Sequence, residues 1–292
     1  MPIDLASKPI VITGASSGIG RATAIACAEA GMPVAVMARR TDRLDALVQA
    51  IRSRGGRAIC LAGSVEDVNA CRRLVERCRQ EFGSVYAVFA NAGYAIEQPV
   101  LSMSDQAVRA MFEVNFFGSL NIIRPASEIM RAQGQGHVLW CSSCLSKISL
   151  PRYAAYCATK AAQDHFARSM RLELRASGIA VSSIHPVGTR TELFDGIEHN
   201  SPGGASLIDR SRNTCAHSPE RVARAVVRCL RRPRGEVWLS TSTRILIAFG
   251  VALPGLADVV IDRLARRRIA RQGAGSSADS SPGAGGGSFG PG

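Results

Sequence analysis

Val11-Ile12-Thr13-Gly14-Ala15-Ser16-Ser17-Gly18-Ile19-Gly20 joins an apolar strand, expected over residues 9–13, to an alanine-rich helix, expected over residues 21–30. Three glycines with the spacing G-x-x-x-G-x-G lie at this junction. Glycine lets the backbone approach a phosphate without a Cβ clash, and the N-terminus of a helix offers free N–H groups and a partial positive charge. The stretch therefore predicts a turn that binds the pyrophosphate of a dinucleotide. An ordinary glycine-rich loop is the alternative for such a turn taken alone.

A second pattern, Tyr156-Cys-Ala-Thr-Lys160, places a tyrosine and a lysine four residues apart in a chain whose 36 basic residues include only three lysines. On a helix, residues i and i+4 share one face, so the ammonium is expected beside the phenol. A tyrosine has a pKa near ~10, and a fixed cation in a dry site lowers that pKa. The pair therefore predicts an acid and base for proton transfer near neutrality. The alternative is a helix with one packed tyrosine and one solvated lysine.

Four stretches occur in the order and spacing of one known family. They are residues 13–20, Asn91-Ala92-Gly93 after an apolar run, Asn115, and Ser143 thirteen residues before Tyr156. On these motifs the chain resembles the short-chain dehydrogenase/reductase family, in its single-domain NAD(P)-dependent branch, over about residues 8–240. The resemblance implies an α/β fold, namely a three-layer, Rossmann-like, doubly wound parallel sheet with helices on both faces.

The hydrophobic pattern predicts the same fold independently. Short apolar runs alternate with longer helical stretches, which is typical of a parallel sheet whose strands are joined by helices. The runs are residues 9–13, 33–38, 57–62, 85–90, 136–141, 180–184 and 236–240.

The resemblance also implies a mechanism, hydride transfer between a nicotinamide and a carbonyl or alcohol carbon. Tyr156 would move the proton, Ser143 would hydrogen-bond the substrate oxygen, and Lys160 would bind the ribose hydroxyls and lower the tyrosine pKa. Asn115 would fix the adjacent helix with its side chain and anchor a water of the proton relay. The alternative is a redox-inactive NADP-binding protein that keeps the fold for regulation or scaffolding.

Cofactor contacts are expected along the ends of several strands. The resemblance assigns them to Gly14, Ser16, Ser17, Gly18, Ile19, Gly20, Arg39, Arg40, Ser64, Asn91, Ala92, Gly93, Tyr156, Lys160, Pro186 and Thr191. Residues 61–65 lack the usual aspartate of the family, so the backbone or Ser64 must contact the adenine. The family's Pro-Gly is Pro186-Val187 here, while Thr191 still fits the carboxamide contact.

The charge at the end of the second strand favours NADP over NAD. NAD users place an acid there and NADP users an arginine, and this chain has Arg39 and Arg40 with no acid. An arginine fork pairs with a phosphate through two hydrogen bonds, so Arg39 is the first candidate and Arg40 its neighbour. Asp42 is expected to cap the following helix instead.

The substrate side is expected to be mostly apolar. The resemblance places Ser143, Leu145, Tyr153, Val187 and Leu193 around the substrate. These residues suggest a lipophilic ketone, aldehyde or secondary alcohol. Residues 192–218 are rich in Gly, Ser, Asn and Asp, which is typical of a lid.

The chain divides into an expected catalytic domain over residues 1–241, an apolar and basic extension over residues 242–271, and a disordered tail over residues 272–292. Residues 221–271 contain twelve arginines and three acids, so they carry most of the net charge of +13. The apolar stretch 245–261 is short for a membrane span and contains Asp258. We expect it to lie in the interface of an anionic membrane. A hairpin that packs over the pocket or forms a dimer contact is the alternative.

Further partners and compartments follow from composition. Nine cysteines scattered through expected helices and strands indicate reduced thiols, and no residue is assigned to a metal. No secretory signal pattern opens the chain, so a cytoplasmic location is expected, or a peripheral one on the inner face of the membrane. The resemblance implies a homo-oligomer that pairs through its two long helices. Nucleic acid is not expected as a partner, because no aromatic platform or known motif accompanies the arginines.

Overall fold

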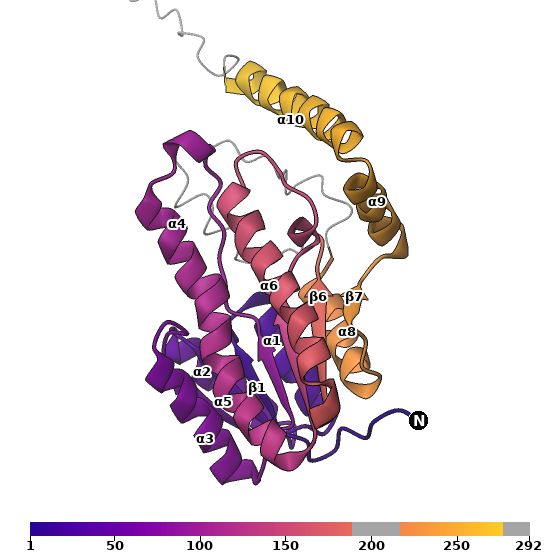
Figure 1. Cartoon of the computed structure of the whole chain (residues 1–292). Helices are drawn as coiled ribbons and strands as arrows, with labels where there is room; N and C mark the ends of the chain where they lie inside the picture. The colour runs from indigo at the N-terminus through magenta and orange to yellow at the C-terminus, as the bar shows by residue number, and fades with distance from the viewer. Residues whose placement is uncertain (189–216, 277–292) are drawn as a thin grey trace, which may run out of the picture.

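One parallel sheet of seven strands forms the centre of the computed structural model, which describes residues 1–188 and 217–276 and side chains up to residue 266 (Figure 1). The strands are β1 (Ile10–Thr13), β2 (Val34–Ala38), β3 (Ala58–Ala62), β4 (Ala87–Ala90), β5 (Gly136–Cys141), β6 (Ile179–His185) and β7 (Glu236–Trp238). Each lies within or next to one of the seven apolar runs, so the expected doubly wound fold is confirmed. The order is β3-β2-β1-β4-β5-β6-β7. The strand order therefore reverses between β1 and β4, where open α/β sheets bind ligands at the carboxyl ends of the strands.

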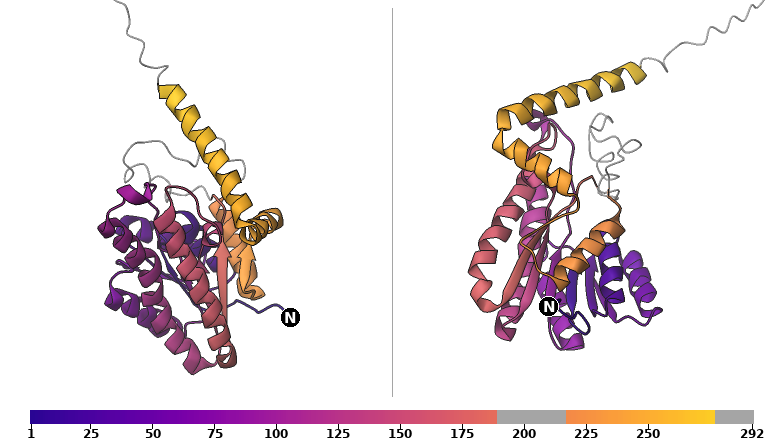
Figure 2. Two further views of the ribbon diagram at one scale, coloured as in Figure 1. Left: turned by 45° about the horizontal axis from the view of Figure 1, so that its top comes forward. Right: turned by 90° about the vertical axis from the view of Figure 1, so that its right-hand side faces the viewer.

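Helices cover both faces of the sheet (Figure 2). One face is covered by α1 (Gly18–Glu29), α2 (Thr41–Arg52) and α8 (Pro219–Arg231), and the other by α3 (Val68–Phe82), α5 (Gly118–Gln133) and α6 (Ala154–Glu173). Neighbouring residues of a strand point to opposite faces, so Ile10 and Ile12 pack in the first core and Val11 in the second. Burial on both faces explains why the strands are continuous apolar runs.

Shorter elements surround the carboxyl ends of the strands. They are η1 (Val100–Ser102), α4 (Asp105–Phe112), the π-helical turn η2 (Glu113–Phe117) and η3 (Cys144–Ser146). The short turn η4 (Arg175–Ser177) precedes β6 and lies at the opposite end of the sheet. Asp42 differs from expectation, because it lies inside the first turn of α2 and Arg40 occupies the N-cap position.

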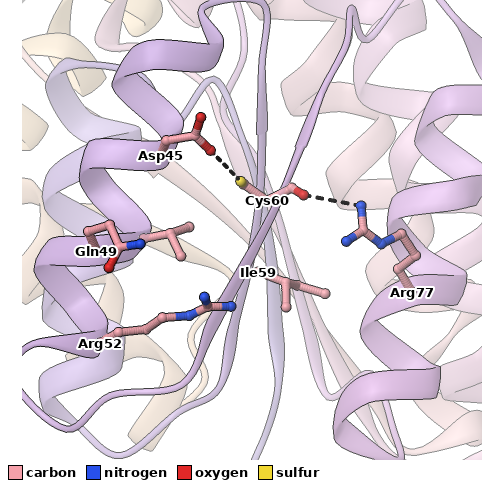
Figure 3. Close-up of a pocket in the computed structure, with 7 residues that line it drawn as sticks. Asp45, Gln49, Arg52, Ile59, Cys60 and Arg77 are labelled. Carbon is pink, nitrogen blue, oxygen red and sulfur yellow. Dashed lines mark hydrogen bonds between the residues drawn. The ribbon is translucent and has the colours of Figure 1, made fainter.

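Arginines cover the outer edge of β3, the first edge strand of the sheet (Figure 3). Arg52 donates two hydrogen bonds, of 3.1 and 2.8 Å, to the carbonyl of Ala58, and Arg77 donates one of 3.2 Å to the carbonyl of Cys60. A shallow pocket of about 390 Å³ between these side chains also contains Asp45. Because exposed edge carbonyls invite pairing with another strand, the two guanidinium groups protect this edge from aggregation.

The C-terminal extension forms two helices beyond β7. Helix α9 (Thr241–Ala252) begins at Ser240, whose hydroxyl accepts from the N–H of Thr243, and α10 (Pro254–Ser276) follows. In Figures 1 and 2, α10 lies above the carboxyl ends of the strands and projects away from the sheet. Helix α10 continues past residue 272, where the disordered tail was expected to begin. The division of the chain at residue 241 stays a proposal.

Among the described residues, no single helix is long and apolar enough to span a membrane, and this includes α9 and α10. The segments Thr241–Ala252 and Pro254–Arg266 meet that requirement only when taken together, and they are bent by 115° relative to each other. The bend coincides with Pro254, which cannot continue the hydrogen-bond ladder of α9.

Candidate active site

The glycine turn between β1 and α1 has the geometry of a phosphate cradle. Gly14 and Gly18 have φ of 67° and 53°, which side-chain-bearing residues rarely adopt. A Cβ on Gly20 would lie 2.3 Å from the carbonyl oxygen of Gly14. Ser17 at the N-cap makes no side-chain bond to the helix, so the first N–H groups of α1 remain available to an anion. The expected turn is present, and its role in pyrophosphate binding stays a proposal.

Asn91 ties the end of β4 to this turn. Its side-chain amide donates to the carbonyls of Thr13 and Gly14, at 3.0 and 3.3 Å. The backbone N–H groups of Asn91 and Ala92 both donate to the hydroxyl of Thr13, at 3.1 Å. The two strand ends at which the sheet order reverses are therefore held in a fixed relation.

Asn115 lies in the π-helical turn η2, a type of turn that is frequent at functional sites. Its side chain accepts a hydrogen bond from the N–H of Tyr94 and donates one to the carbonyl of Tyr94, both 2.9 Å long. It also donates to the hydroxyl of Thr159 on α6, at 3.1 Å. Gly93 makes this approach possible, because a Cβ there would lie 3.0 Å from the Asn115 Oδ1. The side chain of Asn115 thus holds the loop after β4 against α6.

The backbone carbonyl of Asn115 is hydrogen-bonded to two side chains. It accepts one hydrogen bond of 2.5 Å from the Gln163 side chain and one of 2.7 Å from the Ser119 hydroxyl. A carbonyl oxygen has two lone pairs, so both are used. The expected role of Asn115 in anchoring a relay water stays a prediction.

Ser143, Tyr156 and Lys160 come together from β5 and α6. Ser143 follows β5 at the N-cap of η3, where its hydroxyl accepts from the N–H of Leu145 at 3.1 Å. Tyr156 and Lys160 share one face of α6 and are 9% and 3% exposed. The Lys160 ammonium donates to the carbonyl of Cys141 at 2.8 Å and lies 5.6 Å from the centroid of the Tyr156 ring. The structure therefore brings Asn115, Ser143, Tyr156 and Lys160 into one buried cluster.

The electrostatics of Tyr156 also differ from expectation. Burial raises the pKa of Tyr156, and the Ser143 hydroxyl beside the phenol lowers it by a smaller amount. Burial likewise lowers the pKa of Lys160. The expected depression of the tyrosine pKa is absent because the ammonium lies over the ring and donates to a backbone carbonyl. Desolvation of the phenolate is then the larger effect.

Arg40 is the arginine that contacts the glycine turn. Its guanidinium donates to the hydroxyl of Ser16 at 2.8 and 3.2 Å and to the hydroxyl of Ser17 at 3.0 Å. Arg39 is exposed at the end of β2. The Ser64 hydroxyl donates to Glu66 at 2.7 Å. Arg40, rather than the expected first candidate Arg39, is therefore the arginine that the described contacts place against the turn.

The expected substrate residues separate into three groups. Leu145 and Val187 are partly buried, and the carbonyl of Pro186 accepts from the N–H of Cys144, which places the end of β6 beside the loop that contains Ser143. Tyr153 is 1% exposed, and its hydroxyl donates to the buried carboxylate of Glu97 at 2.7 Å. Its expected place beside the substrate stays a prediction. Thr191, Leu193 and most of the expected lid lie outside the described residues.

A buried charge cluster lies behind Ser143. The Lys147 ammonium pairs with Asp164 at 2.6 Å and with Glu236 at 3.0 Å. His185 lies next to them, and its Nδ1 is 3.0 Å from the carbonyl of Ser143. Asp164, His185 and Glu236 are close enough to hold a cation. The ammonium of Lys147 already occupies that position between the carboxylates.

Sequence reasoning missed Gln163 and the cluster around Lys147. Gln163 stands three residues after Lys160, so its position on the same face of α6 was a signal that could have been used. No local pattern indicates the pairing of Lys147 with Glu236, because 89 residues separate them.

Comparisons with known proteins agree with this geometry. The family model described as short chain dehydrogenase matches residues 8–202. An uncharacterized oxidoreductase of Listeria monocytogenes is 33% identical over 231 residues, covering 78% of this chain and 92% of that protein. A fatty acyl-CoA reductase of Mycobacterium tuberculosis is 30% identical over 237 residues, covering 77% and 80%.

A solved short-chain dehydrogenase/reductase from Burkholderia phymatum, in complex with NAD, has a TM-score of 0.75 and 22% identity, covering 84% of this chain and 93% of that chain. At that identity the likeness shows the fold alone. The family match over most of the chain and relatives at 33% and 30% identity together show that this protein belongs to the short-chain dehydrogenase/reductase family of NAD(P)-binding oxidoreductases.

Proposed function

We propose that this protein is an NADP-dependent oxidoreductase that acts on a lipophilic carbonyl compound or secondary alcohol, with Tyr156 as general acid and base. The observation that carries the proposal is the burial of Tyr156 and Lys160 on one face of α6, with Ser143 beside the phenol. The glycine cradle, in which a Cβ on Gly20 would meet the carbonyl of Gly14, fits a dinucleotide. A bound nicotinamide would supply or accept the hydride at C4.

The residues of the cluster have complementary tasks. The Ser143 hydroxyl is placed to donate to the substrate oxygen, and Tyr156 passes its proton to the same oxygen during reduction or removes it during oxidation. The raised pKa of Tyr156 keeps the phenol protonated at neutral pH, which suits carbonyl reduction. Lys160 has a third ammonium hydrogen for the ribose hydroxyls, since Cys141 and Gln163 accept two.

The proposed preference for NADP rests on charge. Arg39 and Arg40 follow β2, and no acid is present at that strand end to repel a 2′-phosphate. Arg40 already lies against Ser16 and Ser17 of the glycine turn, and the exposed Arg39 can approach from the solvent side. Ser64 or the backbone beside it would contact the adenine.

The proposed substrate class rests on the apolar side chains near Ser143. Leu145 and Val187 are partly buried at the ends of η3 and β6. One relative with 30% identity is described as a fatty acyl-CoA reductase, which is consistent with a long apolar substrate. Thr191 and Leu193 remain proposed contacts to the carboxamide and the substrate.

The alternative of a redox-inactive scaffold is less favoured. Burying the Lys160 ammonium and the Asn115 amide costs desolvation energy, which a purely structural core would avoid with apolar side chains. The cluster keeps all four polar groups of a proton-transfer site together.

A homo-oligomer is proposed from the outer faces of α5 and α6. Phe117 at the N-cap of α5 and Phe166 and Leu172 on α6 are exposed, and Phe116 packs edge-to-face against both Phe117 and Phe166. Exposed aromatic clusters of this kind are typical of interfaces. Pairing of two copies through α5 and α6 would cover them.

We also propose that α9 and α10 bind an anionic membrane surface from the cytoplasmic side. Their exposed apolar side chains are Ile245, Leu246, Phe249, Val251, Leu253, Leu256, Val259, Val260 and Leu264. Arg263 and Arg266 lie on the same helix pair, next to further arginines in the sequence. The bend of 115° suits helices that lie in the interface better than one straight span. The competing interpretation, packing against the pocket, is supported by the position of α9, because a Cβ on Gly250 would lie 3.7 Å from the side chain of Ile148.

The central proposal is tested with Tyr156→Phe. Loss of the hydroxyl deletes the acid but leaves the ribose site, so we expect the rate of ketone reduction to fall by roughly 10² to 10⁴ while NADPH binding persists. Activity is measured with NADPH and a panel such as 2-decanone, decanal and their alcohols, and binding by NADPH fluorescence. Tyr86→Phe, at the opposite end of β4, is the matched control. A Tyr156→Phe enzyme with more than about a tenth of the wild-type rate would contradict the mechanism.

A further inference from the structure

Gln163 lies in the interior of the catalytic cluster and makes hydrogen bonds with every polar atom of its side chain. Its Oε1 accepts from the Lys160 ammonium at 3.1 Å. Its Nε2 donates to the Asn115 carbonyl at 2.5 Å and to the Ser119 hydroxyl at 3.0 Å. Gln163 is fully buried, and Asn115, Ser119 and Lys160 are almost so. The amide therefore links the ammonium to the π-helical turn without a water between them.

The surroundings determine the orientation of the amide. A reversed amide would set an NH₂ group against the ammonium and an oxygen against the Asn115 carbonyl, and both contacts are repulsive. Oε1 must therefore face Lys160. An acceptor fixed in this way favours the charged form of a buried lysine.

We propose that Gln163 is a positioning residue that holds the Lys160 ammonium in place and in its charged form, by joining it to the Asn115 carbonyl. The proposal rests on the proposed role of Lys160 in binding the cofactor ribose. Without this bond, the Cys141 carbonyl would be the one remaining hydrogen-bond acceptor of the ammonium among the described residues. Burial alone would favour the neutral amine.

Two titratable groups face Lys160 within residues 1–188 and 217–266. Tyr156 lies on its own helix, and Cys141 lies on β5. The neighbours on η2 and α5, Asn115 and Ser119, carry no charge. A change of Gln163 should therefore act on the ionisation of Lys160 more directly than on any other group.

The test measures how NADPH affinity of the full-length protein falls as pH rises. The ribose contact needs the ammonium, so affinity should be lost as Lys160 deprotonates. Gln163→Leu removes an acceptor from the charged form and should move the midpoint of this loss down by about one pH unit, from the strength of a hydrogen bond to a charged group. Gln163→Glu places a carboxylate beside the ammonium and should move the midpoint up. Binding is followed by NADPH fluorescence, and folding by circular dichroism.

Gln133→Leu is the matched control. Gln133 also uses both ends of its amide on the backbone, with Val85, but at the opposite end of the sheet. It should alter stability and leave the pH midpoint unchanged. Gln163→Glu sets a carboxylate oxygen against the Asn115 carbonyl, so a third variant, Gln163→Met, carries the test if Gln163→Leu does not fold. Gln163→Met keeps the length of the side chain but lacks the amide acceptor, so it should move the midpoint down as Gln163→Leu does.

The outcomes separate two failures. Lys160→Met should abolish the pH midpoint. Suppose that Lys160→Met abolishes the midpoint, but the Gln163 variants keep the wild-type midpoint and bind NADPH more weakly by the same factor at every pH. Gln163 is then merely structural, and this proposal is overturned. A midpoint that survives in Lys160→Met shows that Lys160 is not the titrating group, which overturns its ribose role and this proposal with it. The acid and base role of Tyr156 is judged separately by Tyr156→Phe.

Discussion

Acid should destabilise this protein through His137, which lies in β5 and is 0% exposed. Its Nε2 lies 2.8 Å from the Ser182 hydroxyl on β6. Burial lowers the pKa of His137 from 6.5 to about 3. Below pH 6.5 the unfolded chain therefore binds a proton that the folded chain does not bind. The free energy of unfolding falls as pH drops through 6.5, and this contribution levels off near pH 3.

The magnitude follows from that difference in pKa. A separation of about 3.5 units, from 6.5 to about 3, corresponds to ~5 kcal/mol at the acid limit. At pH 5.0 the same relation gives about 2 kcal/mol, and at pH 7.5 almost nothing. The useful window is therefore pH 7.5 to 5.0, where carboxylates of ordinary pKa remain ionised.

Urea unfolding at pH 7.5 and pH 5.0, followed by circular dichroism, measures the effect. His137→Gln replaces the ring by a neutral amide that does not titrate. Between pH 7.5 and pH 5.0, its free energy of unfolding should therefore fall by about 2 kcal/mol less than that of the wild type, whatever its stability at pH 7.5. Burial also lowers the pKa of His185, but that residue is common to both proteins and cancels. His165→Gln, at an exposed position of α6, should behave as the wild type. Equal acid losses in His137→Gln and the wild type would refute the reasoning.

Four further changes test other parts of the structure. Arg39→Asp should weaken NADPH by about 1.5 to 3 kcal/mol and NADH little, as titrations with both cofactors would show. Gly20→Ala should lower NADPH affinity at least about tenfold, because its Cβ would lie 2.3 Å from a backbone oxygen of the cradle. Lys147→Gln should lower the free energy of unfolding by about 3 kcal/mol, measured in urea, since it leaves the buried carboxylate of Asp164 without its cation. A chain ending at Ser240 should no longer sediment with vesicles of anionic lipid, whereas the full chain should do so less strongly at high salt.

Each of these four predictions has a matched control or a result that would contradict it. An equal loss for NADPH and NADH would remove Arg39 from the phosphate site. Gly255→Ala, which meets no atom within 4 Å, should leave cofactor binding intact. Arg54→Gln, which breaks an exposed pair with Glu29, should change stability by less than about 0.5 kcal/mol. Unchanged vesicle binding after truncation, with loss of dimers or of substrate affinity, would favour packing of α9 and α10 over membrane binding.

Local pattern was enough to predict most of the fold. The strands of a parallel sheet are buried on both faces, so each is a short apolar run that can be recognised without its neighbours. The glycine turn could be recognised for the same reason, since the φ of Gly14 and the close approach at Gly20 concern residues near in sequence. The proposed catalytic pair is also local, because Tyr156 and Lys160 are one helical turn apart.

The spacing of residues along the chain did not predict which hydrogen bonds and pKa shifts arise from burial. The hydroxyl of Tyr153 donates to the carboxylate of Glu97, 56 residues away, and no local pattern predicts this contact. The phenol of Tyr156 was expected to have a lowered pKa because of Lys160, yet desolvation raises it. Burial and hydrogen bonding depend on how many elements surround a side chain, which spacing along one helix does not reveal.

The amino-acid sequence by itself determined the family, the parallel sheet, the glycine turn and the four residues Asn115, Ser143, Tyr156 and Lys160 that the structure brings together, because each depends on short-range pattern. Only the tertiary structure decided what those residues touch. The bond between Gln163 and the Asn115 carbonyl spans 48 residues, and the pair of Lys147 with Glu236 spans 89. Such contacts arise when the sheet brings the ends of β4, β5, β6 and β7 together, and their energies come from groups that meet only after the chain has folded.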